Sequence, residues 1–416
     1  MDPLSFESLF ELFHATFKMN INDLPDDCLL LIFDQFYQFR QFATLMKVCR
    51  RWKTLAEKGL KKITHLDVIL TTTLMKIQDS IKQSQVPSTR KCIITIYCDN
   101  FLLINRKRLK KIKLSKLLPN VKIIHLENYN VNCRCTFLVH LLANANQIKG
   151  LSGLGHSFEV NHKCKILKRE EKRITSFLSD IQFLGISNDL IVTSYLRTFG
   201  HFKKLKSLGN AIGSHHQTVN LLHVLKFAQD LPNLEQLVTF CGDEFDYHFV
   251  QLGSQLPIFG NLLHLQLVDT SKNGSTVSKF LNLCPNLLNL SLGARTHPMI
   301  LFNQINKNFN VQRLNLLDWD REKILETIEK FPNCRYLSIC DYYFSLSSHE
   351  LIQIMSVLPH LSLLYIKSDT TDLAEKRIVK NYCHSRNPKI DLYFGSTDEK
   401  LLMSNELYRK FHDSFL

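Results

Sequence analysis

The sequence predicts an α/β chain in which a small helical unit is followed by a solenoid, with a curved parallel sheet on the inside and helices on the outside. Three observations lead to this prediction. Short helical patterns fill residues 21–61, a strand-like pattern then recurs roughly every 25 residues, and helical periodicity fills the segments between its copies. A unit that recurs in this way buries its apolar face only by stacking on its neighbours, so an elongated array is expected.

Composition places the chain among globular proteins with an ample core. Of its 416 residues, 45 % are hydrophobic and 22 % are charged, and the length is too great for one compact core. No run of 18 apolar residues occurs, so we expect no membrane span. The acidic residues Asp2, Glu7 and Glu11 and the lack of a basic start argue against a secretory signal. Twelve scattered cysteines fit free thiols, and hence the reducing cytoplasm or nucleus.

Residues 1–20 carry apolar side chains at helical spacing, namely Phe6, Leu9, Phe10, Phe13 and Phe17. We expect a leading amphipathic helix that packs on the unit after it. A docking helix for another protein is the alternative interpretation.

The stretch from Leu24 to Trp52 predicts two or three short helices. Leu24-Pro25 followed by two aspartates is typical of a helix start, because proline fits the first turn and acids complement the helix dipole. Apolar residues then recur at three- and four-residue steps, first from Leu29 to Phe36 and again from Phe42 to Trp52. A unit of about 40 residues generally needs a disulfide, a metal or a partner for stability, and this one points to a partner.

The same stretch resembles the F-box family. The residues that match its pattern are Leu24, Pro25, Asp26, Asp27, Leu29, Ile32, Phe33, Val48, Cys49, Arg50, Arg51 and Trp52. Cys28 and Phe36 depart from it, and both are apolar. The resemblance implies an F-box at residues 21–61 that docks on the Skp adaptor of an SCF ubiquitin ligase, with cullin and RING subunits supplied by other chains. The implied adaptor-binding residues, some of which belong to the core instead, are Leu24, Pro25, Leu29, Ile32, Phe33, Val48, Cys49 and Trp52. A generic helical hairpin that caps a larger domain is the alternative.

From residue 62 onward the chain repeats a strand signature that is often preceded by Pro-Asn. Clear copies are LPNVKIIHL at 118–126, LPNLEQLVT at 231–239, FGNLLHLQL at 259–267, CPNLLNLSL at 284–292, NFNVQRLNL at 308–316, FPNCRYLSI at 331–339 and LPHLSLLYI at 358–366. Weaker copies begin at residues 63, 92, 148, 180 and 202. From Asn233 to His360 the spacings are 28, 25, 24, 23 and 27 residues. A drifting period of this size resembles the leucine-rich repeat family. We expect about twelve repeats over residues 62–395 and a capping helix over residues 396–416.

Alternation along each strand predicts which residues line the concave side. These are His65, Asp67, His125, Glu127, Gln236, Phe240, His264, Gln266, Asn289, Ser291, Arg313, Asn315, Tyr336, Ser338, Tyr365 and Lys367. Tyrosine, phenylalanine and arginine are enriched at interaction hot spots, so a groove for a protein or peptide substrate is predicted. We expect the binding residues among His125, Glu127, Gln236, Phe240, His264, Gln266, Arg313, Tyr336 and Tyr365. A wall that is partly only solvated is the alternative.

The net charge of +14 comes largely from basic runs at 106–116 and 163–173 and from Lys203, Lys204 and Lys206. A solvated outer face explains them, and an import signal or an acidic partner is the alternative. No aromatics interleave the first run, so we do not expect nucleic acid stacked there.

No catalytic constellation is evident. The Cys133, Cys135 and His140 group and the His162 and Cys164 pair lack a second pair at zinc spacing, and no phosphate-binding loop occurs. His215-His216 lies in a polar loop. We therefore expect no metal and no cofactor, and a non-catalytic receptor.

Together these patterns predict a substrate receptor that docks on the Skp adaptor and holds a protein substrate on its repeats. The alternative is a scaffold that binds an acidic partner through a basic outer face. A phosphate-reading site would need several arginines on the concave wall, and only Arg313 is predicted there. We therefore expect that phosphorylation is not the main recognition signal.

Overall fold

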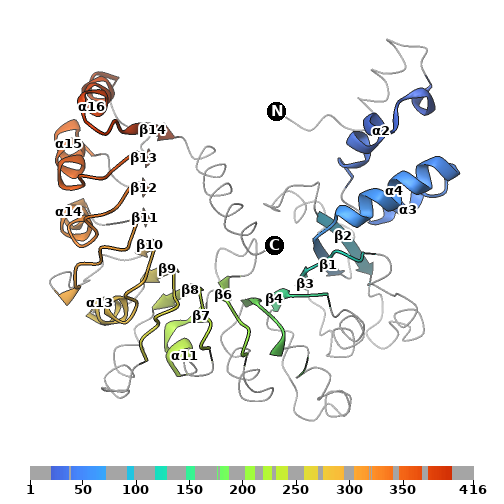
Figure 1. Ribbon diagram of the computed structural model, residues 1–416, viewed down its shortest axis with the longest axis horizontal. Helices are drawn as coiled ribbons and strands as arrows, with labels where there is room; N and C mark the ends of the chain where they lie inside the picture. The colour runs from blue at the N-terminus through green and yellow to red at the C-terminus, as the bar shows by residue number, and fades with distance from the viewer. Residues whose placement is uncertain are drawn as a thin grey trace.

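A computed structural model shows the chain as an arc of stacked strands with helices at one end and along the outside (Figure 1). It describes residues 20–36, 39–71, 91–97, 118–128, 147–154, 176, 179–186, 202–210, 219–226, 231–241, 257–269, 275–294, 304–317, 319, 321–340, 346–367 and 373–395. Among these residues, no helix is long and apolar enough to cross a membrane.

The N-terminal helical unit occupies residues 20–64. It consists of η1 (Ile21–Asp23), α2 (Asp26–Phe33), α3 (Phe39–Leu45) and α4 (Arg50–Lys62). Pro25 is the N-cap of α2, and Asp26 and Asp27 lie in its first turn, where the helix dipole favours negative charge. Cys49 is the N-cap of α4, and its Sγ accepts a hydrogen bond from Trp52 N at 3.4 Å.

One apolar core holds these helices together. Leu29 and Phe33 of α2 are buried, and the Phe33 ring meets the Trp52 ring edge to face with centroids 5.2 Å apart. Phe42 of α3 and Leu55 of α4 are also buried in this core. Each helix is too short to be stable alone, so packing of these faces supplies the stability.

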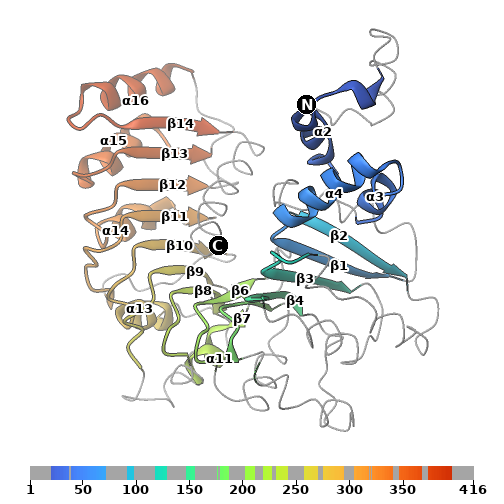
Figure 2. The ribbon, with the colours of Figure 1, turned by 45° about the vertical axis from the view of Figure 1, so that its right-hand side comes forward.

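The strands of the described chain form one parallel sheet. Its strands are β1 (His65–Thr71), β2 (Lys91–Tyr97), β3 (Ile123–Asn128), β4 (Gly150–Leu154), β5 (Phe183–Ile186), β6 (Ser207–Asn210), β7 (Val219–Asn220), β8 (Gln236–Cys241), β9 (His264–Asp269), β10 (Asn289–Ala294), β11 (Arg313–Leu317), β12 (Tyr336–Cys340), β13 (Leu363–Lys367) and β14 (Asp391–Gly395). The order runs from β14 down to β8 and then β6, β5, β4, β3, β1 and β2, while β7 pairs with β8 (Figure 2). The predicted fold class, a helical N-terminal unit followed by a solenoid with an inner parallel sheet, is confirmed.

Chain order and strand order differ at the N-terminal end. Along the chain, β2 lies between β1 and β3. Instead β1 pairs with both β2 and β3, so β2 is the edge strand beside the N-terminal helical unit. Strand order therefore differs from chain order here, because strand pairing is a non-local choice that a local periodicity cannot specify.

Alternate residues of each strand point into the core in a continuous row. In β9, β10 and β11 the paired residues Leu265, Leu290 and Leu314 are all buried. The same row continues through Leu337 and Leu364 in the next two strands. Each leucine thus packs between two equivalent leucines, and the core extends along the whole array.

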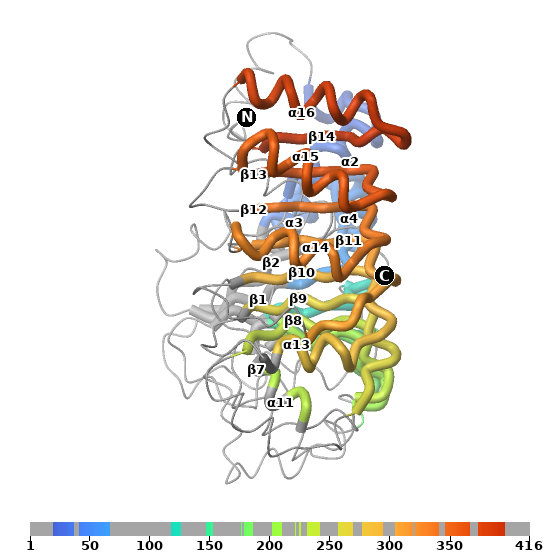
Figure 3. The backbone as a smooth tube through the Cα atoms, turned by 90° about the vertical axis from the view of Figure 1, so that its left-hand side faces the viewer, coloured from blue at the N-terminus to red at the C-terminus, as the bar shows by residue number. Residues whose placement is uncertain are grey.

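Helices cover the outer side of this sheet (Figures 1 and 3). They are α11 (Leu221–Lys226), α13 (Ser275–Asn282), α14 (Ile324–Ile328), which follows the short η8 (Arg321–Lys323), α15 (Ser348–Val357) and α16 (Leu373–Ser385).

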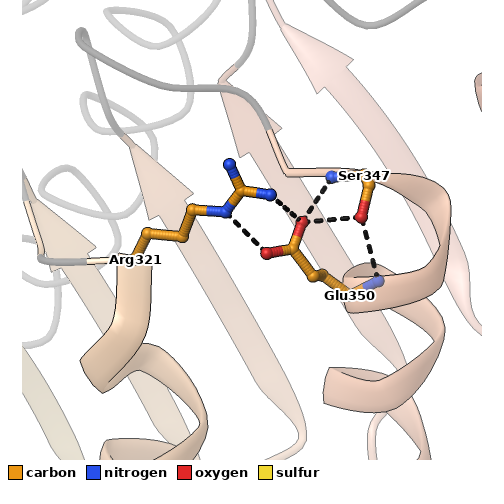
Figure 4. A network of polar contacts seen from close by, with 3 residues as sticks. All are labelled: Arg321, Ser347 and Glu350. Atoms are coloured by element: carbon orange, nitrogen blue, oxygen red, sulfur yellow. Dashed lines mark hydrogen bonds and ion pairs between the residues drawn. The ribbon is translucent and has the colours of Figure 1, made fainter.

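One polar network ties two neighbouring outer segments together. Ser347 and Glu350 form a capping box at the start of α15, and Arg321 of η8 donates from Nε and Nη2 to the two oxygens of Glu350, at 2.6 Å each (Figure 4). These hydrogen bonds hold the pKa of the Glu350 carboxyl at about 2.

An asparagine ladder links the turns that precede the strands. The side-chain amide of each asparagine donates a hydrogen bond to a backbone carbonyl of the preceding repeat. The acceptor residue is the one immediately before the equivalent asparagine of that repeat. The pairs are Asn261 to Pro232, Asn286 to Gly260, Asn310 to Pro285 and Asn333 to Phe309, at 2.7–3.0 Å. The recurrent asparagine of the sequence pattern therefore has a structural role, because it satisfies a turn carbonyl of its neighbour.

The N-terminal helical unit is continuous with the solenoid. α4 leads into β1 through Ile63, which is buried with Leu66 in the same core cluster as Phe33. The Asn120 amide donates to the carbonyl of Lys61 at 2.6 Å, which extends the asparagine ladder onto the end of α4. The unit and the sheet are therefore one packed body at this junction.

Several predicted features lie outside the described residues. They are the leading helix predicted at 1–20, apart from Asn20, which is the N-cap of η1, the basic runs at 106–116 and 163–173, the cysteines and histidines between 133 and 164, His215-His216 and the closing segment 396–416.

Candidate functional site

An apolar stripe faces solvent on α2, on the side away from its buried residues. Pro25, Cys28 and Leu31 are exposed, and Leu31 leaves 67 % of its surface uncovered. Spacing of three residues places these side chains on one helix face. Val48, in the turn between α3 and α4, is 53 % exposed. An uncovered apolar stripe of this kind is typical of an interaction surface.

Arg51 fixes the segment that leads into α2. Its Nε donates to Asp26 Oδ1 at 2.8 Å, while its Nη1 and Nη2 donate to the carbonyls of Asn22 and Leu24 at 2.5 and 2.6 Å. A planar guanidinium can satisfy three acceptors at once, which a lysine cannot do in this geometry. The position of Pro25 and of the exposed stripe therefore depends on a side chain of α4.

The structure divides the eight residues that the sequence associates with adaptor docking. Leu29, Phe33 and Trp52 are buried in the core of the unit, Leu24 and Ile32 are partly buried, and Pro25, Val48 and Cys49 are exposed. Leu31 was missed by the sequence reasoning. Its position two residues after Leu29, on the opposite side of the helix, is the signal that could have revealed it.

Residues 21–61 match the family model described as F-box-like. No curated protein matches the chain. Domains of the F-box family bind the Skp adaptor in SCF ubiquitin ligase complexes and occur in subunits that are not themselves catalytic. The helical unit is therefore an F-box-like domain.

The concave wall is a second candidate surface, and strand register defines its rows. From β8 to β14 the first row contains Gln236, His264, Asn289, Arg313, Tyr336, Leu363 and Asp391, and the second contains Gln266, Ser291, Asn315, Ser338, Tyr365 and Tyr393. Nearer the N-terminal end, His125 pairs in register with Ser152. Phe240 lies in a third row with Val268. The alternation predicted from sequence is consistent with this register. Glu127 lies on β3, where the structure does not describe its side chain.

Polar side chains on the N-terminal and middle parts of this wall bond to one another. The His125 ring Nδ1 lies 3.0 Å from Ser152 Oγ, Ser207 Oγ donates to Gln236 Oε1 at 2.8 Å, and Asn289 Nδ2 donates to His264 Nδ1 at 2.7 Å. His125 and Gln236 are buried. These residues hold neighbouring strands in register, so much of their hydrogen-bonding capacity is already used within the wall.

The exposed side chains among the described residues of the two rows lie on β9, β12 and β14. Gln266 is exposed, and Tyr336 and Tyr393 leave 39 % and 51 % of their surfaces uncovered. The Arg313 guanidinium carbon lies 4.9 Å from the centroid of the Tyr336 ring. Tyr365 differs, since it is buried against Gly395, where an added Cβ would clash with the tyrosine ring and its oxygen. Of the predicted substrate-binding residues whose side chains are described, Gln266 and Tyr336 are exposed, and Phe240, His264 and Arg313 are partly buried.

His264 is neutral over the physiological range. Burial lowers its pKa to about 4, the charge of Arg313 acts in the same direction, and Glu235 opposes both. Because the ring accepts a hydrogen bond at Nδ1, the neutral form is also the one that the contact with Asn289 requires.

We predict that this histidine makes stability pH-dependent. Its pKa is lower in the folded than in the unfolded state, so its contribution is complete above about pH 6.5 and is lost as the pH falls toward about 4. A urea midpoint measured at about pH 7 and about pH 5 should fall less for His264→Gln than for the wild type. Equal falls for the two proteins would contradict the prediction.

Buried thiols in the described solenoid are unsuited to covalent chemistry. Burial raises the pKa of Cys334 to about 12 and also raises the pKa of Cys284 and Cys383. A thiolate is the reactive form, so these cysteines are core residues rather than acceptors of an acyl group. Within the described ranges, no three histidine, cysteine or acidic side chains gather as a metal site.

Proposed function

We propose that this chain is the substrate-recognition subunit of an SCF ubiquitin ligase. The F-box-like domain docks on the Skp adaptor through the exposed stripe of α2 and the turn at Val48, and the leucine-rich repeats hold a protein substrate. The observation that carries the proposal is the F-box-like match at residues 21–61 together with uncovered apolar side chains on that domain. Cullin and RING subunits then join through the adaptor.

The mechanism in this proposal is proximity. The chain forms no bond with the substrate and raises the effective concentration of a substrate lysine near a recruited conjugating enzyme. Proximity is effective only when the two binding surfaces keep a fixed separation. The shared core at the junction and the bond from Asn120 to Lys61 support such a fixed separation. We expect the complex to act in the cytoplasm or nucleus and to bring the substrate to degradation by the proteasome.

The test is co-purification of the full chain with the Skp adaptor. We predict that the wild type forms a stable complex and that Leu31→Asp with Val48→Asp weakens it by about 100-fold or more, because a carboxylate in an apolar contact cannot be solvated. Ile378→Asp on α16, a position that is similarly exposed, is the matched control and should bind as the wild type does.

Salt separates this proposal from the scaffold alternative. Docking through an apolar face persists at raised ionic strength, whereas binding through basic runs weakens steeply. A wild type that does not bind the adaptor, or that loses it at moderate salt, would overturn the proposal.

A further inference from the structure

Two charged side chains on the concave wall, Arg313 and Asp391, lie in one row. Arg313 on β11 is partly buried, and Asp391 on β14 is exposed. In the part of the chain that the structure describes, neither has an oppositely charged partner. Other cations of the same region are paired, such as Arg321 with Glu350. A partly buried cation without a counter-charge is uncommon, since desolvation is offset only by pairing.

Strand register sets the order of the side-chain types along the row. Arg313 pairs in register with Tyr336, Tyr336 with Leu363, and Leu363 with Asp391. The row therefore presents a cation, an aromatic ring, an aliphatic side chain and an anion in that order. With roughly 4.8 Å between strands, the two charged strands are about 14 Å apart.

Each member of the row is suited to contact a partner. The guanidinium of Arg313 lies over the Tyr336 ring, which fixes its orientation before a partner arrives. Tyr336 itself is 39 % exposed, and a rigid aromatic side chain loses little entropy on binding. Tyr393, also exposed, lies one row away on β14 and widens the apolar centre.

We propose that β11 to β14 bind an extended segment of a partner protein that crosses the strands, with a carboxylate at Arg313 and a basic side chain at Asp391. An extended chain advances about 3.3 Å per residue, so the two charged residues of the segment stand about four positions apart with apolar residues between them. This inference rests on the proposed function, because it gives the chemical class of the substrate segment that the repeats hold.

Charge complementarity also selects carboxylate over phosphate. Within β8 to β14, Arg313 is the one cationic residue type in its row apart from His264, which lies two strands away and is neutral. A single guanidinium forms a bidentate pair with a carboxylate, whereas recognition of a phosphate usually recruits several cations.

The test uses the full chain bound to the Skp adaptor and a displayed library of random peptides of about 12 residues, long enough to span the row. Peptides selected by the wild type should carry an acidic and a basic residue about four positions apart in one order. The charge-swapped variant Arg313→Glu with Asp391→Lys should select the opposite order. Similar selections by the two proteins, or none by the wild type, would overturn the proposal.

The affinities of a selected peptide and its variant for two forms of the protein then make a double-mutant cycle. Replacing its acidic residue with glutamine should lower affinity for the wild type about tenfold, and for Arg313→Gln less than about twofold. Arg335→Gln, an exposed arginine one residue before β12, is the matched control and should behave as the wild type does. A phosphoserine peptide that binds more than about tenfold tighter than the acidic one would refute the carboxylate assignment.

Adaptor binding and circular dichroism are measured for every variant. Because Arg313 and Asp391 lie on the wall and not in the core, all variants should stay folded and keep the adaptor. A wild type that does not bind the adaptor contradicts the proposed function. The same peptide selection by the wild type and the charge-swapped variant contradicts only the proposal that Arg313 and Asp391 bind the segment.

Discussion

Truncation of Phe33 to alanine is expected to destabilise the F-box-like domain by about 3–5 kcal/mol and to abolish adaptor binding with it. The side chain is fully buried, and its ring packs on Trp52 and, at 6.3 Å between centroids, on Phe36. Short helices depend on such packing because none is stable alone. Hydrogen exchange at the amides of α2 and α4 measures the local loss, and co-purification with the Skp adaptor measures its functional consequence.

Leu31→Ala is the matched control for this prediction. The leucine lies on the same helix but is exposed, so the free energy of unfolding should change by about 0.5 kcal/mol or less while adaptor binding weakens. The pair of variants separates a core residue from a contact residue. If Phe33→Ala kept both its exchange protection and the adaptor, the interior of the domain would not be what positions the docking face.

Residue type and spacing predicted the helical unit well but could not separate its buried residues from its exposed face, which we propose as the docking face. Phe33 and Leu31 are both large and apolar, and only the packing of α2 against α4 decides that one is buried and the other exposed. Trp52 shows the same difficulty, since its burial makes it unsuitable as a probe of contact. The docking role of the eight residues chosen from sequence stays a prediction.

The solenoid was predictable because its signals are local. Alternation with period two assigned His264, Arg313 and Tyr336 to one side of their strands, in agreement with their register. Relations between repeats were not predictable in this way. The sequence pattern identifies Asn286 but does not show that its side chain binds the carbonyl of Gly260. It likewise does not show that Arg313 and Asp391 lie in the same row of the sheet. The position of β2 outside β1 is a third relation of this kind.

Leu290→Ala is expected to destabilise the C-terminal part of the solenoid by about 2–5 kcal/mol without releasing the adaptor. Leu290 is buried between Leu265 and Leu314 in the continuous leucine row, so the substitution leaves a cavity that rigid neighbouring strands fill poorly. Repeats contact only their neighbours, and the effect should therefore remain within a few strands of β10. Hydrogen exchange resolved by segment measures this, with protection lost around β9 to β11 and kept in α2 and α4.

The control for Leu290→Ala is Leu373→Ala at the start of α16, where 82 % of the side chain is exposed and little stability should change. Uniform loss of protection from α2 to β14 in Leu290→Ala would show instead that the chain unfolds as one cooperative body. Local loss has a functional consequence. If the F-box-like domain then stays folded, we expect substitutions on the concave wall to change only the proposed substrate binding. The two proposed surfaces can then be tested independently in the same full chain.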